Sequence, residues 1–203
     1  MKSSSSLGVR ETIKFIETEY VNIIHEILKT GKNPFFNDAK LYQNAYTRVQ
    51  LVADYGEKQC EEMVEYYIQL IEKYIIDCKN KLIEESKSNQ SNLIEGFILY
   101  TTKINFLIYW MVRVFCYLDR YHTKAKYQKS LSQFAMELYK SNFYAQFKDN
   151  KQNEINNLKS EEKNGNEESN IILKNIIEIL EDLKLQKPKI TKLNGIIKWV
   201  NEM

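Results

Sequence analysis

Histidine and cysteine are the side chains of this 203-residue chain that are best suited to hold a metal or to attack a substrate. The two histidines, His25 and His122, lie far apart in the sequence, and neither has a second potential ligand at helical spacing. A zinc site needs three or four ligands close together, so we expect a structural role for both histidines. The cysteines are an odd number at wide spacings, with no Cys-x-x-Cys pair: Cys60, Cys78 and Cys116. Each falls on the apolar phase of a helical pattern, which predicts reduced thiols in a core rather than a disulfide framework.

Sequence patterns that are typical of enzymes are also missing. The chain has no glycine-rich phosphate loop and no His-Glu-x-x-His pair, and no serine, cysteine or lysine stands in a recognisable activating context. The carboxylates lie mainly between the apolar positions, so they are expected on solvated helix faces. We therefore expect a protein that is not an enzyme, with no catalytic residue, no cofactor and no metal.

The composition predicts the fold class. Apolar residues make up 43% of the chain, which is enough for a packed core, whereas only 6 Gly and 2 Pro are present. So few turn-forming residues argue against a fold with many tight turns, such as a β-sandwich. Apolar residues recur at three- and four-residue spacing almost throughout, which is the period of a helix with one buried face. The sequence therefore predicts an all-α protein with long helices.

Charge and hydropathy limit the partners of the chain. Its 29 basic and 27 acidic residues are interspersed. Proteins that bind nucleic acid usually gather a basic excess on one face or tail, so nucleic acid is not an expected partner. The most apolar stretch, Ile104–Val112, is closed by Lys103 and Arg113 and is much shorter than the ~20 residues that span a bilayer. The first residues lack the apolar run of a signal peptide, so we expect a soluble protein of the cytoplasm and/or nucleus, without membrane contact.

Breaks in the apolar pattern divide the first part of the chain into five expected helices. Their apolar stripes run over residues 9–27, 41–52, 60–82, 97–118 and 131–143. Asn37 or Asp38 is expected to cap the second helix, which ends at Gly56. The fourth helix is expected to run to Arg120, and Gly96 and the pair Thr101-Thr102 are weak points at which it is expected to kink.

Two segments carry more than a core pattern. The first reads Leu41-Tyr42-Gln43-Asn44-Ala45-Tyr46-Thr47 and is followed by Gly56-Glu57-Lys58. It resembles the second helix of the cullin amino-terminal repeat, in the form of the branch that binds BTB-domain adaptors. The second reads Phe115-Cys116-Tyr117-Leu118-Asp119-Arg120-Tyr121 and is similar to the cullin signature of an apolar pair, Tyr-Leu, Asp, Arg and an aromatic residue. With weaker matches in the same order, the resemblance covers roughly residues 12 to 184.

This resemblance implies an elongated, multi-helix cullin-repeat bundle that acts as a non-catalytic scaffold. It implies a subunit of a cullin-RING ubiquitin ligase complex, which takes part in ubiquitin-dependent protein catabolism and holds a BTB-fold substrate adaptor. The adaptor-binding residues that it implies are Phe36, Tyr42, Tyr46, Tyr117 and Arg120. In this family a carboxy-terminal region recruits the RING subunit, and that region is absent from this chain.

The residues alone leave other interpretations open. Tyr42 and Tyr46 share one helix face beside the core stripe, so their spacing alone favours burial as a wider part of that stripe. Tyr117 and Arg120 also share a face, but Arg120 at a helix end could bond terminal carbonyls or pair with Asp119 or Glu137. Alternative functions are a cullin that binds the BTB-like linker of F-box proteins, a decoy that sequesters adaptors, and a helical-rod subunit of a tethering complex.

The expected domain organisation has three parts. Residues 1–12 are expected to form a flexible N-terminal segment, and residues 13–184 a cullin repeat-like helical domain. The composition changes to Asn, Glu, Lys and Ser after Lys148, and a helical pattern returns at Ile171–Leu183. Pro188 interrupts that pattern, so residues 185–203 are expected to be a linker and the start of a further helix.

Overall fold

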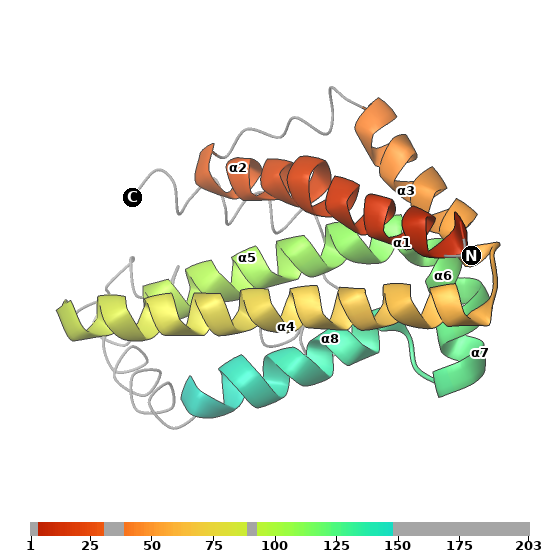
Figure 1. The fold of residues 1–203 in the computed structure, drawn as a ribbon. Helices are drawn as coiled ribbons and strands as arrows, with labels where there is room; N and C mark the ends of the chain where they lie inside the picture. Colours follow the sequence, from red (N-terminus) through yellow and green to blue (C-terminus); the bar gives the residue numbers. More distant parts are fainter. Residues whose placement is uncertain (1–3, 31–38, 89–92, 148–203) are drawn as a thin grey trace. The chain divides into compact units, whose positions relative to one another are not determined.

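The computed structural model describes residues 4–30, 39–88 and 93–147. Every element in these ranges is helical, which confirms the predicted all-α class (Figure 1). The two longest helices are α4 (Glu57–Ser88) and α5 (Leu93–Val114). The predicted cap at Asn37 or Asp38 and the predicted organisation after Lys148, including the 185–203 linker, lie outside the described residues.

The described residues belong to two compact units. The first contains those of Met1–Ile71 together with Leu107–Ala135, and the second contains those of Glu72–Phe106 and Met136–Val200. The helices α4, α5 and α8 (Leu131–Tyr139) each contribute residues to both units.

The first unit begins with α1 (Ser4–Phe15), a π-helical turn η1 (Ile16–Val21) and α2 (Asn22–Thr30). Phe15 and Asn22, on either side of η1, both have right-handed helical dihedrals, so the helix continues through the turn. The helix starts before residue 13, where the sequence pattern placed the start of the helical domain, and Val9 and Thr12 are buried on it. Whether residues 1–12 are flexible stays a prediction.

Helix α3 (Ala39–Ala53) packs against α1 in this unit, and the two lie side by side in Figure 1. The Arg48 guanidinium of α3 lies over the Phe15 ring of α1, 4.4 Å from its centroid. The buried residues of α3 are those of its predicted stripe: Ala45, Val49 and Val52. The chain leaves α3 through a turn at Gly56, which has a φ of 137°. Glycine is favoured there because side chains rarely tolerate a positive φ, and the predicted end of this helix is confirmed.

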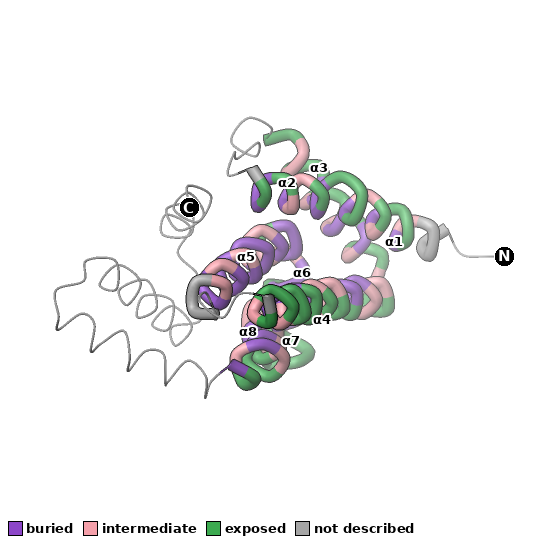
Figure 2. The backbone as a smooth tube through the Cα atoms, turned by 90° about the vertical axis from the view of Figure 1, so that its left-hand side faces the viewer, coloured by how far each residue is buried: buried purple, intermediate pink, exposed green. Residues whose placement is uncertain are grey.

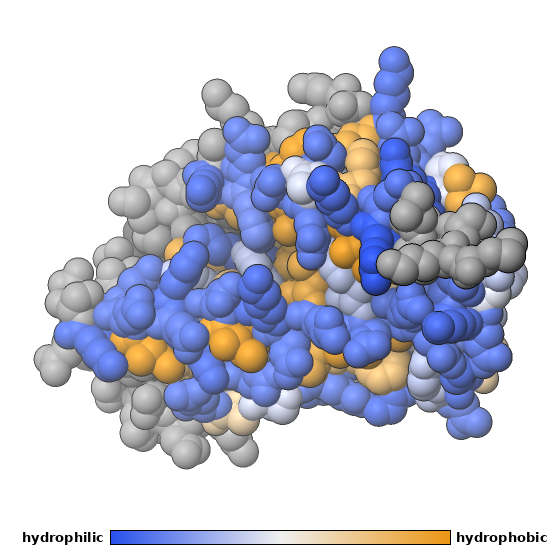
Figure 3. Space-filling model, viewed as in Figure 1, coloured by the Kyte–Doolittle hydropathy of each residue, from blue (hydrophilic) through white to orange (hydrophobic). Residues whose placement is uncertain are grey.

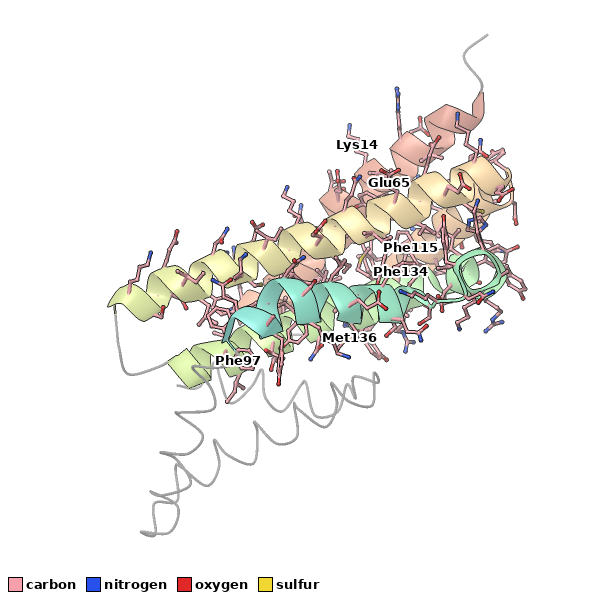
Figure 4. All side chains as sticks on the ribbon, turned by 90° about the horizontal axis from the view of Figure 1, so that it is seen from below. Lys14, Glu65, Phe97, Phe115, Phe134 and Met136 are labelled. Carbon is pink, nitrogen blue, oxygen red and sulfur yellow. The ribbon has the colours of Figure 1, made fainter. Side chains whose placement is uncertain are left out.

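The fourth predicted helix breaks at a position that the sequence did not indicate. Helix α5 is continuous past Gly96 and Thr101, and the chain departs from helical geometry at Phe115, with φ −90° and ψ 9°. The short helix α6 (Cys116–Leu118), the π-helical turn η3 (Asp119–Thr123) and α7 (Lys124–Tyr127) follow. Phe115, which is labelled in Figure 4, is buried. Its ring lies 6.4 Å from that of Tyr66 and 5.4 Å from that of Tyr67, both on α4.

Helix α5 is therefore not interrupted at Gly96 or at Thr101-Thr102, and the kink there stays a prediction. A Cβ atom at Gly96 would lie 2.6 Å from Leu82 Cδ1, so this glycine permits close packing of α5 on α4. The Thr102 hydroxyl bonds the Ile98 carbonyl of the preceding turn at 2.8 Å, and the Thr101 hydroxyl lies 2.9 Å from that of Tyr139. Both hydroxyls are satisfied without opening the helix.

The second unit holds an aromatic core. The Phe97 ring of α5 lies 5.5 Å from Phe143, and Phe143 lies 5.5 Å from Tyr139 and 5.3 Å from Phe147. Phe143 belongs to a third π-helical turn, η4 (Lys140–Tyr144), which extends α8. All of these rings are buried, and Figure 2 shows the buried positions along α5 in purple. Tilted and stacked ring contacts of this kind add to the free energy gained by burial.

The surface and the cysteines agree with this division between core and exterior. The surface over α4 is mostly hydrophilic in Figure 3, as expected for charged residues beside a buried stripe. Cys60 and Cys78 are buried, Cys116 is half-buried, and all three are free thiols. Burial raises the pKa of the Cys78 thiol to about 12, as expected for an unreactive core cysteine. Among the described helices, none is both long and apolar enough to cross a membrane.

Candidate functional site

Four of the five candidate residues lie in the first unit, on elements that pack together. Tyr42 and Tyr46 belong to α3, Tyr117 to α6 and Arg120 to η3. Helix α3 packs against α6, and α6 packs against η3. The three tyrosines are half-buried, and Arg120 is exposed. We call these four residues the tyrosine–arginine surface. The fifth candidate, Phe36, lies outside the described residues.

Tyr42 is held between its own helix and the end of α5. Its ring stacks on that of Tyr46, with centroids 6.5 Å apart and planes 24° from parallel. Its hydroxyl donates a hydrogen bond to the Arg113 carbonyl at 3.4 Å. Burial raises the pKa of Tyr42 above its ordinary value, with the thiol of Cys116 as a smaller cause, so the phenol is neutral at pH 7.

Arg113 is a residue of this region that the sequence did not indicate. Its guanidinium lies over three aromatic rings, with centroids at 5.3 Å (Tyr109), 5.6 Å (Trp110) and 5.7 Å (Tyr42). It also donates a hydrogen bond to the Tyr109 hydroxyl at 2.6 Å. A cation over aromatic faces is attracted by their quadrupoles, so Arg113 fixes the orientation of the Tyr42 ring. The only signal in the sequence was an arginine that follows Tyr and Trp near a helix end.

Tyr117, on α6, makes a hydrogen bond to the residue that follows α3. Its hydroxyl donates a hydrogen bond to Asp54 Oδ1 at 2.9 Å, and this bond raises the pKa of Tyr117. Its ring lies 4.8 Å from that of Tyr121, which is 61% exposed. Two hydrogen bonds, from Tyr42 to Arg113 and from Tyr117 to Asp54, therefore join the α3 region to the α5–α6 segment.

Arg120 lies beside the same exposed ring. Its guanidinium carbon is 5.9 Å from the Tyr121 centroid. A hydrogen bond with Tyr121 raises the pKa of Arg120, with smaller contributions from Cys116 and Tyr46, so the guanidinium is charged at every physiological pH. The contribution of Tyr46 indicates that its phenol lies near the charge. In the described part of the chain the Tyr46 hydroxyl makes no hydrogen bond, and the Tyr46 ring stacks on that of Tyr42.

Asp119 does not pair with Arg120, although the sequence left that possibility open. Its carboxylate is buried and accepts a hydrogen bond from the Leu131 N–H at 2.7 Å. The other oxygen forms an ion pair with Lys124 at 3.1 Å. Asp119 thus joins η3 to the first residue of α8. Within the segment 117–121, the aspartate is structural, while Tyr117 is half-buried and Arg120 and Tyr121 are exposed.

The chemistry of this surface is that of its phenols and its one guanidinium. Over the described ranges, no three His, Cys, Asp or Glu side chains are placed to hold a metal ion. The tyrosine–arginine surface offers neutral phenols, one unengaged hydroxyl and one permanent positive charge. Tyrosine and arginine are the side chains that most often anchor protein interfaces.

Comparison with known families agrees with the resemblance of the two segments. The model of the cullin alpha-solenoid domain matches residues 18–194, which is most of the chain. The protein therefore belongs to the cullin family, and its helices form a cullin-type scaffold domain. No curated protein and no solved structure matches the chain.

Proposed function

We propose that this cullin domain binds a BTB-fold substrate adaptor through the tyrosine–arginine surface, as a non-catalytic scaffold subunit of a cullin-RING ubiquitin ligase. The observation that carries the proposal is the meeting of two distant segments. Tyr42 and Tyr46 come from α3, Tyr117 and Arg120 come from α6 and η3, and the Tyr117–Asp54 hydrogen bond joins these elements.

The exposure of these side chains supports an interface. Each tyrosine is half-buried, so a partner can cover the remaining ring area while the protein holds the rest. A tyrosine ring buries a large area at a low entropic cost, and its hydroxyl can satisfy a polar group of the partner. Tyr42 and Tyr117 are already fixed by hydrogen bonds, which lowers the entropic cost of binding. Such anchors suit an interface of standard size, roughly 1,600 Å² in total.

Calorimetric titration of the chain with a purified BTB-fold adaptor tests the proposal. We expect saturable binding that Tyr46→Ala weakens about 30-fold, which is the effect of losing a hot-spot residue worth ~2 kcal/mol. Tyr127→Ala is the matched control, because Tyr127 is 37% exposed in the same unit and lies outside the surface. Binding only to an F-box protein linker would assign the chain to another adaptor class. Equal losses in both variants would contradict the proposed location.

A further inference from the structure

The direction of the Tyr117–Asp54 hydrogen bond has a chemical consequence for any partner. The phenol donates its only proton to Asp54 Oδ1 at 2.9 Å. A tyrosine hydroxyl has one proton and two lone pairs, so the Tyr117 oxygen is left as an acceptor only. The carboxylate of Asp54 is also acceptor-only, and Asp54 is exposed. Together the two side chains form an edge that accepts hydrogen bonds and carries a negative charge, which we call the Asp54 edge.

The neighbouring residue has the opposite character. The Arg120 guanidinium carries only N–H donors and a permanent positive charge, and it is exposed beside Tyr121. Tyr117 lies next to both groups, since its hydroxyl bonds Asp54 and its ring lies 4.8 Å from Tyr121. The surface therefore has a polar pattern: acceptors at one end and donors at the other.

We propose that Asp54 is a specificity-determining residue of this surface, which selects partners that place a basic side chain or free N–H donors against the Asp54 edge. This inference rests on the proposed function and names the chemistry of the adaptor. An adaptor with a carboxylate at that position would leave acceptors facing acceptors, which costs desolvation and repulsion. An acidic or carbonyl group of the adaptor belongs opposite Arg120 instead.

Backbone hydrogen bonds around Asp54 give this edge a fixed position. The Asp54 N–H bonds the Gln50 carbonyl at 3.0 Å, which continues the hydrogen bonding of α3. The next two N–H groups, of Tyr55 and Gly56, bond Val52 and Ala53 carbonyls at 3.1 and 3.4 Å. With the Tyr117 hydroxyl attached, the carboxylate is held in one direction before any partner arrives. A fixed charge discriminates between partners better than a mobile one.

The test measures the affinity of a BTB-fold adaptor for Asp54→Asn, which keeps the shape of the side chain and an acceptor oxygen but removes the charge. We expect a three- to fivefold loss of affinity at low salt, the range of an exposed ion pair, and a weaker salt dependence than in the wild type. Asp54→Lys is expected to lose at least tenfold. Asp77→Asn is the matched control, because Asp77 is an exposed aspartate of the second unit and its charge lies outside the surface.

A second readout uses the chain without a partner. Titration of the Tyr117 ring by ¹³C NMR is expected to show a lower pKa in Asp54→Ala than in the wild type, because the hydrogen bond that raises it is removed. An unchanged pKa would overturn the premise. If the wild type binds the adaptor and Asp54→Asn binds equally well with the same salt dependence, the specificity role is overturned alone. If the wild type binds no BTB-fold adaptor, the proposed function fails, and this inference with it.

Discussion

Replacing Asp119 by alanine should destabilise the fold, although the two residues that follow it, Arg120 and Tyr121, are exposed. Asp119 is only 8% exposed, and its carboxylate accepts a hydrogen bond from the Leu131 N–H at 2.7 Å. Alanine leaves this buried donor without an acceptor, which costs about 1–3 kcal/mol. The ion pair to Lys124 adds at most ~1 kcal/mol, because the lysine side chain is 57% exposed. We expect a total loss of about 2–4 kcal/mol, which is a large part of the roughly 5–15 kcal/mol that stabilise a domain.

Urea denaturation followed by circular dichroism measures this loss. Asp119→Asn retains an oxygen that can accept from Leu131, so it should lose less than half as much as Asp119→Ala. Lys124→Ala should lose at most ~1 kcal/mol, because it removes only the ion pair. A loss below about 0.5 kcal/mol in Asp119→Ala, or equal losses in the alanine and asparagine variants, would refute the view that Asp119 acts as a buried acceptor for α8.

Three further outcomes follow from the structure. Tyr46→Ala should weaken adaptor binding about 30-fold in calorimetry. Its free energy of unfolding, from urea denaturation, should fall by less than the 3–5 kcal/mol typical of a buried aromatic residue, and the reverse result would return Tyr46 to the core. Thr101→Val should cost about 1–3 kcal/mol in urea denaturation, because the buried Tyr139 hydroxyl loses its 2.9 Å partner, and the double variant with Tyr139→Phe should cost less than the sum of the two single changes. Burial raises the pKa of Tyr20, Tyr67 and Tyr139 above the ordinary 10.0. As the pH rises above about 10, these phenols therefore lose their protons in the unfolded state before they do so in the folded state, and the urea midpoint should fall. A constant midpoint up to pH 11 would contradict this.

The helices could be predicted because burial on one face leaves a period in the sequence. The stripe of α3 and its end at Gly56 were both predicted, since each depends on local geometry. The break at Phe115 gave no such signal, because a buried phenylalanine continues the apolar stripe through the bend. The role of Gly96 could not be read locally either, since it depends on Leu82 of another helix.

The π-helical turns left no usable pattern. A single turn of this kind changes the hydrogen-bond partners of a few residues and needs no special residue type. The turn η3 nevertheless determines where Arg120 and Tyr121 lie relative to the buried Asp119.

The candidate site could be predicted only in pairs. Spacing placed Tyr42 with Tyr46, and Tyr117 with Arg120, because helical neighbours share a face. Their meeting required the packing of α3 on α6, which the family resemblance implied and helical spacing could not. Asp54 and Arg113 were missed for the same reason, since each acts on a tyrosine that lies more than 60 residues away in the sequence.

The most direct test of the proposed interface is hydrogen–deuterium exchange of the chain with and without a purified BTB-fold adaptor. Binding through the tyrosine–arginine surface should slow exchange in α3, in α6 and in η3, where the contacting side chains lie. The second-unit part of α4, from Glu72 onward, should exchange equally in both samples. The footprint should disappear in Tyr46→Ala at an adaptor concentration that saturates the wild type. Protection that leaves α3 and α6 unchanged, or no protection at saturating adaptor, would contradict the account.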